Sequence, residues 1–199
     1  MEFNKVINRR RMVRNYAGAG SVPREQIERI MAVAGRAPSA GFAQGQSFIV
    51  VTDAKTRQRI GEIGGQPSYT ERGFQPWISE APVHIILCTS PSIYSERYAE
   101  PDKAGTPGAE GKWPVPWWHW DAGASFMLLL LAAVNEGLAA GFLAFQVNAL
   151  PPLKELLGIP EEVTPLGVVT IGKPAATQPK GSAARGRKPP AEVIHWEKY

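Results

Sequence analysis

Residues 10–53 read RRMVRNYAGAGSVPREQIERIMAVAGRAPSAGFAQGQSFIVVTD, and this stretch decides the fold. After a basic cluster, Pro23 suits the first turn of a helix whose apolar residues recur at helical spacing over residues 27–34. Pro38 ends that helix and opens a loop of small residues. Residues 47–52 form an apolar, β-prone run that is typical of a buried strand. This order predicts an α/β or α+β domain.

The rest of the chain alternates helix and strand patterns in the same way. Further strands are predicted at residues 83–89, 142–147 and 166–171. Helices are predicted at residues 3–13, from the N-cap Asp53 to about Gly64, around Trp77 and Ile78, and at residues 150–157. The run Ala122–Val134 is apolar nearly all round, so it predicts a central helix capped by Asp121.

We find no repeat and no linker, so residues 1–199 are predicted to form one domain. Residues 90–118 are long, Pro-rich and aromatic, which is typical of a variable lid or substrate-binding segment. Residues 173–199 are mostly polar yet end in the β-prone VIHW. They are predicted to form a C-terminal arm that pairs with another chain.

Composition excludes several classes of protein. Cys88 is the one cysteine, lying in an apolar run, so a disulfide framework within the chain is excluded and a reducing, cytoplasmic location is expected. The N-terminus lacks the apolar core of a signal peptide. The longest apolar run, residues 122–134, is shorter than the roughly 20 residues of a membrane span, so no membrane partner is expected.

The net charge of +4 is concentrated at residues 9–14 and in a late basic group, Lys180, Arg185, Arg187 and Lys188. Such clusters suit nucleic acid, an acidic surface or a phosphate-bearing small molecule. A nucleic-acid-binding module is the less favoured of these, because the arginines are not interleaved with exposed aromatic residues and no known binding motif is present. We therefore expect a small-molecule partner and no nucleic acid.

Two segments could bind such a molecule. On the predicted helix, Arg10 and Arg14 share a face and Arg11 lies about 100° away, so their guanidinium groups suit a phosphate; the alternative is a solvated basic face. In the loop APSAGFAQ, residues 37–44, small residues would let the backbone approach a flat ligand, with Ser39 and Gln44 as hydrogen-bonding groups. An ordinary helix-to-strand connection is the alternative.

Several common catalytic motifs are absent. No GxGxxG follows a strand and no GxxxxGK[ST] occurs, so neither a Rossmann site nor a P-loop is predicted. His84, His119 and His195 are isolated, and the sequence has no CxxC or HExxH, so no metal site is predicted. No GxSxG or Ser-His-Asp set is evident.

Taken in order, these segments resemble the nitroreductase-like family of FMN-dependent oxidoreductases. The resemblance lies in RRMVRNY, in SVPREQIERIMAVAGRAPSAGFAQ and in SFIVVTD, followed by DAGASFMLLLLAAVNEGLAAGF, LGVVTIGKPA and RGRKPPAEVIHW. It covers most of the chain and is weakest over residues 90–118. It implies an α+β fold, a three-layer α/β/α sandwich with a mixed central sheet, in an intertwined homodimer with two FMN sites at the interface.

The resemblance also implies which residues hold FMN. Arg10 and Arg11 would bind the phosphate, and Arg14 would reach the ribityl chain or the N1–C2 edge of the ring. Pro38, Ser39 and Ala40 would lie against the flavin of the other subunit, and Gln44 matches a glutamine common there. The remaining residues of the implied site are Met12 and Phe42, where the family often has serine and asparagine, the ring-edge residues Gly141, Phe142, Leu143 and Ala144, and the phosphate ligands Arg185 and Arg187.

The implied reaction has two halves. NADH or NADPH reduces the flavin at N5, and a small oxidised acceptor, nitroaromatic- or quinone-like, then takes the electrons. A positive charge near N1 would stabilise the reduced flavin, and no catalytic side chain is required. The aromatic segment from Trp113 to Trp120 is the candidate substrate wall, with packing or dimer contact as the alternative. Its leading candidates, together with two tyrosines earlier in the chain, are Tyr94, Tyr98, Trp113, Trp117 and Trp118.

Three other interpretations of the flavin site stay open. The chain also resembles enzymes that cleave reduced FMN with oxygen to form dimethylbenzimidazole, for which FMN is the substrate. A deazaflavin could replace FMN. A flavin storage or sensing protein would bind FMN without turnover.

Overall fold

The computed structural model describes residues 1–18, 20–179 and 182–199, so Lys180 of the late basic group lies outside it. Its strands are β1 (Gln46–Val51), β2 (Val83–Thr89), β3 (Ala139–Ala144) and β4 (Thr164–Gly172), in the sheet order β1-β2-β4-β3. Neighbouring strands are all antiparallel, so the predicted mixed sheet is wrong for these strands. Among the described residues, parallel pairing is confined to an isolated bridge between Met12 and Ala140.

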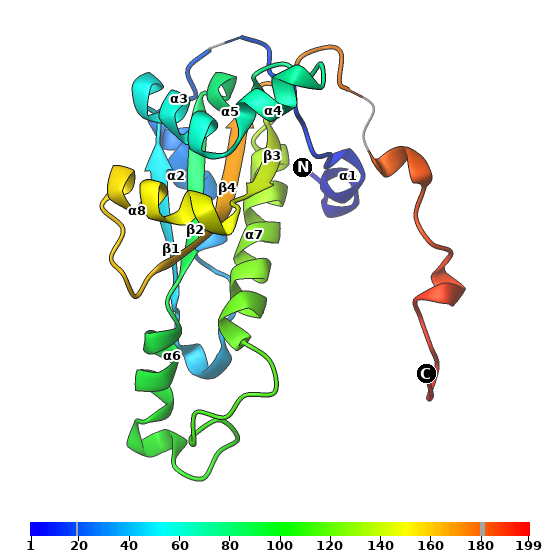
Figure 1. Ribbon diagram of the computed structural model, residues 1–199. Helices are drawn as coiled ribbons and strands as arrows, with labels where there is room; N and C mark the ends of the chain where they lie inside the picture. The colour runs from blue at the N-terminus through cyan, green and yellow to red at the C-terminus, as the bar shows by residue number, and fades with distance from the viewer. Residues whose placement is uncertain (19, 180–181) are drawn as a thin grey trace.

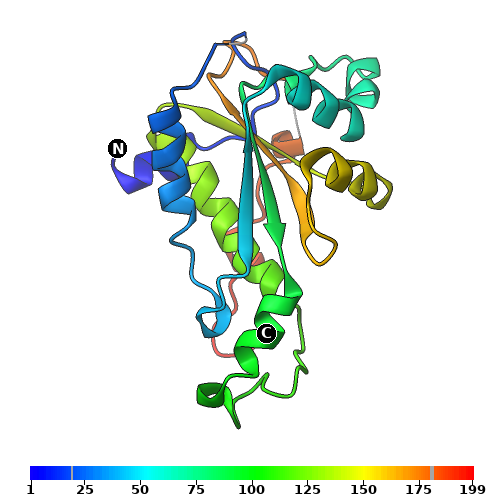
Figure 2. The ribbon, with the colours of Figure 1, turned by 90° about the vertical axis from the view of Figure 1, so that its left-hand side faces the viewer.

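Helices cover both faces of this sheet, so the predicted α+β class and its three layers are confirmed (Figure 1). On one face lie α2 (Arg24–Ala34) and α7 (Trp117–Asn135), packed on the sheet through Ile30, Leu129 and Val169. The opposite face carries α3 (Ala54–Ile63), α4 (Gln66–Glu71), α5 (Trp77–Glu80) and α8 (Leu150–Leu157). Figure 2 shows α2 and α7 on one side of the sheet and α4 and α8 on the other.

Two helices lie outside these layers. Helix α1 (Phe3–Arg9) packs beside α7, and α6 (Pro91–Tyr98) extends past the end of the sheet (Figure 1). Short 3-10 turns complete the structure at Ala40–Phe42 (η1), Pro101–Lys103 (η2), Val147–Ala149 (η3), Ser182–Arg185 (η4) and Pro190–Glu192 (η5). None of the helices in the described residues is long and apolar enough to cross a membrane.

Several sequence predictions are confirmed. Asp53 caps α3, since its carboxylate accepts a hydrogen bond from the Thr56 backbone N–H at 2.8 Å. The strand at residues 83–89 is found as predicted and is fully buried. Cys88 lies within it as a free thiol, and burial raises the pKa of that thiol to about 11, which suits a packing residue rather than a nucleophile.

Other boundaries were predicted wrongly, because contacts with distant residues decide them. Helix α1 ends at Arg9 instead of residue 13, since the chain turns extended there to meet β3. Strand β3 begins at Ala139, where it pairs with the end of β4, instead of at residue 142. Helix α7 begins at Trp117, so Asp121 lies inside it and is not its cap.

The segment 90–118 contains α6, which begins on Pro91. Proline at a first helical position is favourable, because its missing N–H would lack an intrahelical partner there anyway.

The C-terminal arm leaves the body of the molecule after β4 (Figure 1). Its first part is held to the N-terminal segment, where Ala175 N donates to Asn15 O at 3.0 Å and Ala17 N donates to Lys173 O at 2.9 Å. Residues 182–199 are exposed, including Trp196 at 83%. The described part of the arm contains no strand, so within one chain the β-prone end remains unpaired.

A buried polar network holds α5 against the sheet. The Arg57 guanidinium of α3 donates to the carbonyl oxygens of Ser79 and Ala81, each at 2.6 Å. His84 of β2 is fully buried, and its Nε2 lies 2.6 Å from the Ile78 carbonyl, so Nε2 carries the proton. Burial, together with the neighbouring Arg57 charge, lowers the pKa of His84 to about 4. The neutral imidazole therefore belongs to the folded state.

We predict that acid destabilises the protein through His84. Its pKa is about 4 in the folded state against its usual 6.5, so the unfolded chain binds the proton first as the pH falls. The free energy of unfolding should decrease by ~3 kcal/mol between pH 7 and pH 4 from this group. Urea unfolding of the native protein and of His84→Gln across this range measures the contribution as the difference between the two slopes. His119→Gln, at an exposed histidine, is the control, and an unchanged slope in His84→Gln would contradict the assignment.

Candidate functional site

The basic segment runs in an extended conformation along the outer edge of β3. Val13 is buried and its backbone N–H donates to Ala140 O at 3.0 Å. The predicted shared helical face of Arg10 and Arg14 is therefore wrong. In an extended chain alternate residues point the same way, so Arg10, Met12 and Arg14 still share a side. Arg11 points elsewhere, and its Nη1 donates to Asn8 O at 2.6 Å at the end of α1.

Arg14 is the most constrained arginine of this segment. Its guanidinium carbon lies 5.7 Å from the centre of the Trp77 ring, and its Nε is buried without a hydrogen-bond partner among the described residues. The backbone N–H of Arg14 donates to Gln178 Oε1 at 3.2 Å, which ties it to the start of the arm. A buried donor without an acceptor is costly, so this position is suited to a ligand that supplies one.

The charge of the basic segment is not compensated within the chain. No carboxylate of residues 1–18, 20–179 or 182–199 forms an ion pair with Arg10, Arg11 or Arg14. Three guanidinium groups within five residues repel one another unless an anion lies between them. The segment is therefore suited to bind an anion such as a phosphate.

Gly141 lets the basic segment approach β3. A Cβ atom at Gly141 would collide with Val13 O and would lie 2.8 Å from Thr170 Oγ1 and 3.1 Å from the Trp77 ring. Of the predicted ring-edge residues, Gly141 and Leu143 are buried, and Phe142 packs against Phe126 with ring centres 4.5 Å apart. A flat ligand at this edge would therefore meet backbone and the exposed Ala144 rather than these side chains.

The loop of small residues is held in one conformation by polar contacts. Asp121 Oδ2 accepts hydrogen bonds from Ala40 N at 2.8 Å and from the Tyr94 hydroxyl at 2.7 Å. Ser39 Oγ accepts from Gln44 N at 2.9 Å, so the Ser39 hydroxyl shapes the loop. Burial raises the pKa of Tyr94, which therefore stays protonated as a donor.

Phe42 is presented to solvent by this fixed loop. Its φ is 57° and its side chain is 71% exposed, an unusual combination for a large apolar residue. Gln44 also has a positive φ, 54°. Strained and exposed residues of this kind are often found at binding sites.

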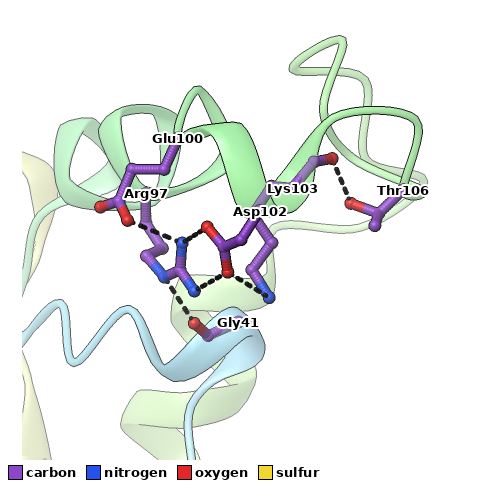
Figure 3. Close-up of polar contacts among 6 residues, drawn as sticks. All are labelled: Gly41, Arg97, Glu100, Asp102, Lys103 and Thr106. Atoms are coloured by element: carbon purple, nitrogen blue, oxygen red, sulfur yellow. Dashed lines mark hydrogen bonds and ion pairs between the residues drawn. The ribbon is translucent and has the colours of Figure 1, made fainter.

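Arg97 of α6 fastens the loop from outside (Figure 3). Its Nε donates to Gly41 O at 2.8 Å, while Nη1 and Nη2 each bind an Asp102 oxygen at 2.7 Å. Glu100 adds a contact to Nη1 at 2.9 Å. The bidentate pair fixes the plane of the guanidinium group, so the Gly41 carbonyl is held at one place.

The aromatic candidates divide into two groups. A hollow of about 370 Å³ is lined by Pro38, Ser39, Ala40, Tyr98, Trp117, Trp120 and Asp121. Tyr98 and Trp117 line this hollow, so they stay candidates for a substrate wall. Tyr94, Trp113 and Trp118 do not line the hollow: Tyr94 is fully buried, and the two tryptophans pack against each other with ring centres 5.6 Å apart.

Trp120, the last residue of the candidate aromatic segment, and Asp121, which the sequence predicts only as a helix cap, also line the hollow. On α7 they lie three and four residues after Trp117, and this spacing brings all three to one face. The spacing of these residues in WWHWD is the sequence feature that indicates a shared face. It indicates this only if the helix begins at Trp117, whereas the sequence predicts a start at Asp121.

One chain does not bring the basic segment and the small-residue loop together. The loop is bonded to Asp121 near the start of α7, whereas the basic segment meets Ala140, just beyond the other end of α7 (Figure 1). A helix of 19 residues is ~28 Å long. Within the described chain, Arg185 and Arg187 are exposed and make no ion pair.

Comparisons with a family model, with named proteins and with solved structures agree with one another. A model described as the Nitroreductase family matches residues 7–173. The FMN reductase (NAD(P)H) of Bacillus subtilis is 30% identical over 201 residues, 100% of this chain and 74% of that protein. A protein of Archaeoglobus fulgidus, provisionally named NADH dehydrogenase/NAD(P)H nitroreductase, is 30% identical over 175 residues, 87% and 86% of the two chains. The structure of B. megaterium NfrA2 has a TM-score of 0.77 at 27% identity, covering 100% of this chain and 76% of that one.

We predict that Arg97→Gln loosens the small-residue loop. The backbone amides of Ala40, Phe42, Ala43 and Gln44 are all hydrogen-bonded, so they should exchange slowly in the native protein. Without the Arg97 contact to Gly41, their exchange with deuterium should become about tenfold faster. Glu100→Gln, which leaves the contacts to Gly41 and Asp102 in place, is the matched control. Equal exchange in the two variants would show that Arg97 does not hold the loop.

Proposed function

The chain belongs to the nitroreductase family of NAD(P)H-dependent flavin oxidoreductases, and from this premise we propose that it reduces a small oxidised acceptor, nitroaromatic- or quinone-like, with NADH or NADPH. FMN, when bound, supplies the redox chemistry by accepting a hydride at N5 and passing it on. The buried, unpartnered Nε of Arg14 beside β3 is the observation that carries the proposal.

The residues present fit FMN. Arg10 supplies charge for a phosphate, and Arg11, which points to the other side of the segment, adds charge from the end of α1. No carboxylate in the described chain competes for either arginine. Arg14 is held half-buried over Trp77, where its charge can serve the ribityl chain or the N1–C2 edge. Met12, 41% exposed, offers no hydroxyl.

A homodimer completes the proposed site. The two half-sites of one chain lie near opposite ends of α7, so Pro38, Ser39 and Ala40 serve the flavin bound to the basic segment of the other chain. The exposed arm, with Arg185 and Arg187, reaches the second chain and supplies the remaining phosphate contacts. Exposed apolar side chains along α7, including Met127 at 44%, support an interface there. The free, buried Cys88 suits a cytoplasmic location.

We predict that the purified protein absorbs in the visible range as a flavoprotein and bleaches under anaerobic NADH or NADPH. Reoxidation by a nitroaromatic or a quinone should restore the spectrum, because the reduced flavin passes its electrons to the acceptor. Flavin bands that neither nucleotide bleaches would favour FMN cleavage, a deazaflavin or storage instead. A protein that takes up no added FMN would contradict the proposed site.

We also predict that Arg10→Gln with Arg14→Gln releases FMN. Each charged hydrogen bond contributes roughly 1.5–3 kcal/mol, so the dissociation constant should rise at least about a hundredfold. Ultrafiltration followed by absorbance of the filtrate measures the flavin released. Arg24→Gln with Arg36→Gln removes two exposed arginines outside the basic segment and should leave the flavin content unchanged. Equal retention in the two double variants would contradict the assignment.

A further inference from the structure

The hollow at the start of α7 combines aromatic rings with a carboxylate, and reduction of a neutral acceptor requires no carboxylate there. Trp120 is 67% exposed, and it lines the hollow together with Trp117, Tyr98 and Asp121. Three electron-rich rings and a carboxylate in one hollow are suited to an organic cation.

Asp121 brings a negative charge that the chain leaves without a cation. Its Oδ2 holds both hydrogen bonds, from Ala40 N and from the Tyr94 hydroxyl, and these fix the carboxylate in place. In the part of the chain that the structure describes, no lysine, arginine or histidine forms an ion pair with it. A half-buried carboxylate gains from a cation that enters beside it.

The other charges near the hollow balance one another. Arg97 and Lys103 are paired with Glu100 and Asp102 (Figure 3). None of these four lines the hollow. Lys103 Nζ lies 5.7 Å from the centre of the Tyr98 ring, so this ring already has one cation–π contact. Asp121 therefore sets the sign of the charge that the hollow attracts.

We propose that this hollow selects acceptors that carry a quaternary ammonium or protonated amine group on an aromatic ring. The inference rests on the proposed function, because the small-residue loop that forms one wall also faces the flavin in that proposal. A volume of about 370 Å³ suits a single-ring molecule with such a substituent. The cation binds among Trp117, Trp120 and Asp121, and the ring it carries extends toward the loop.

Binding can be tested separately from turnover. Isothermal titration calorimetry of the full chain with its flavin, at constant ionic strength, compares benzyltrimethylammonium, benzyl alcohol and benzoate. We expect the cation to bind about tenfold more tightly than the alcohol, and benzoate to bind least. Asp121→Asn keeps an oxygen acceptor for Ala40 and Tyr94 but removes the charge, so it should abolish the preference. Trp120→Leu changes an exposed side chain and should weaken cation binding several-fold. It tests the inference independently of whether Asp121→Asn folds.

Glu110→Gln is the matched control, since Glu110 is an exposed carboxylate 11 residues before Asp121 and does not line the hollow. Its cation preference should equal that of the native protein. Equal affinity for the three probes in the native protein, or a preference that survives both Asp121→Asn and Trp120→Leu, would overturn the inference.

Kinetics distinguish failure of the inference from failure of the proposed function. With 4-nitrobenzyltrimethylammonium and 4-nitrobenzyl alcohol as acceptors, we expect a KM about tenfold lower for the cation and a similar kcat. Asp121→Asn should equalise the two KM values. Reduction of both acceptors with equal KM would overturn the inference and leave the proposed function standing. Selective binding of the cation without reduction of either acceptor would overturn the proposed function alone.

Discussion

The hydrogen bond from Val13 N to Ala140 O is the contact on which the rest of the site depends. It draws the N-terminal segment out of helix α1 and lays it along β3, and it can form because Gly141 leaves room for the Val13 carbonyl. The three arginines are thereby placed on an edge of the sheet instead of on a solvated helix. Their charges then lie where a ligand can meet both side chains and β3 backbone.

Residues outside the proposed ligand site position this edge of the sheet through hydrogen bonds. Arg57 and His84 hold the carbonyl groups of α5, and α5 presents the Trp77 ring to Arg14. The nearby Arg57 charge and burial both favour the neutral imidazole, so this network depends on the protonation state of His84. Loss of the neutral state of His84 would therefore disturb the position of α5 as well as the free energy of unfolding.

Helix α7 separates the two halves of the site. Near its start, Asp121 fixes the small-residue loop and lines the aromatic hollow, and beyond its end the chain enters β3 beside the basic segment. Because a helix of this length is rigid, one chain cannot close the two halves on one ligand. In the proposed homodimer, a second chain against the exposed side of α7 would supply the missing half, so the homodimer, the flavin site and the arm form a single proposal.

The sequence by itself determined that four strands occur, though not the bounds of β3, and it determined the helices at 24–34 and 54–63 and the buried thiol. It also marked the basic segment as a candidate anion site. Periodicity, an N-cap and uncompensated arginines are read from neighbouring residues, because the forces involved act within a few positions. The tertiary structure alone decided that Arg10–Arg14 is extended and that Asp121 anchors a loop about 80 residues earlier. It also decided that Trp120 lines a hollow while Tyr94 is buried. Each of these outcomes depends on hydrogen bonds and packing between segments distant in the sequence, and no local pattern encodes which segments meet.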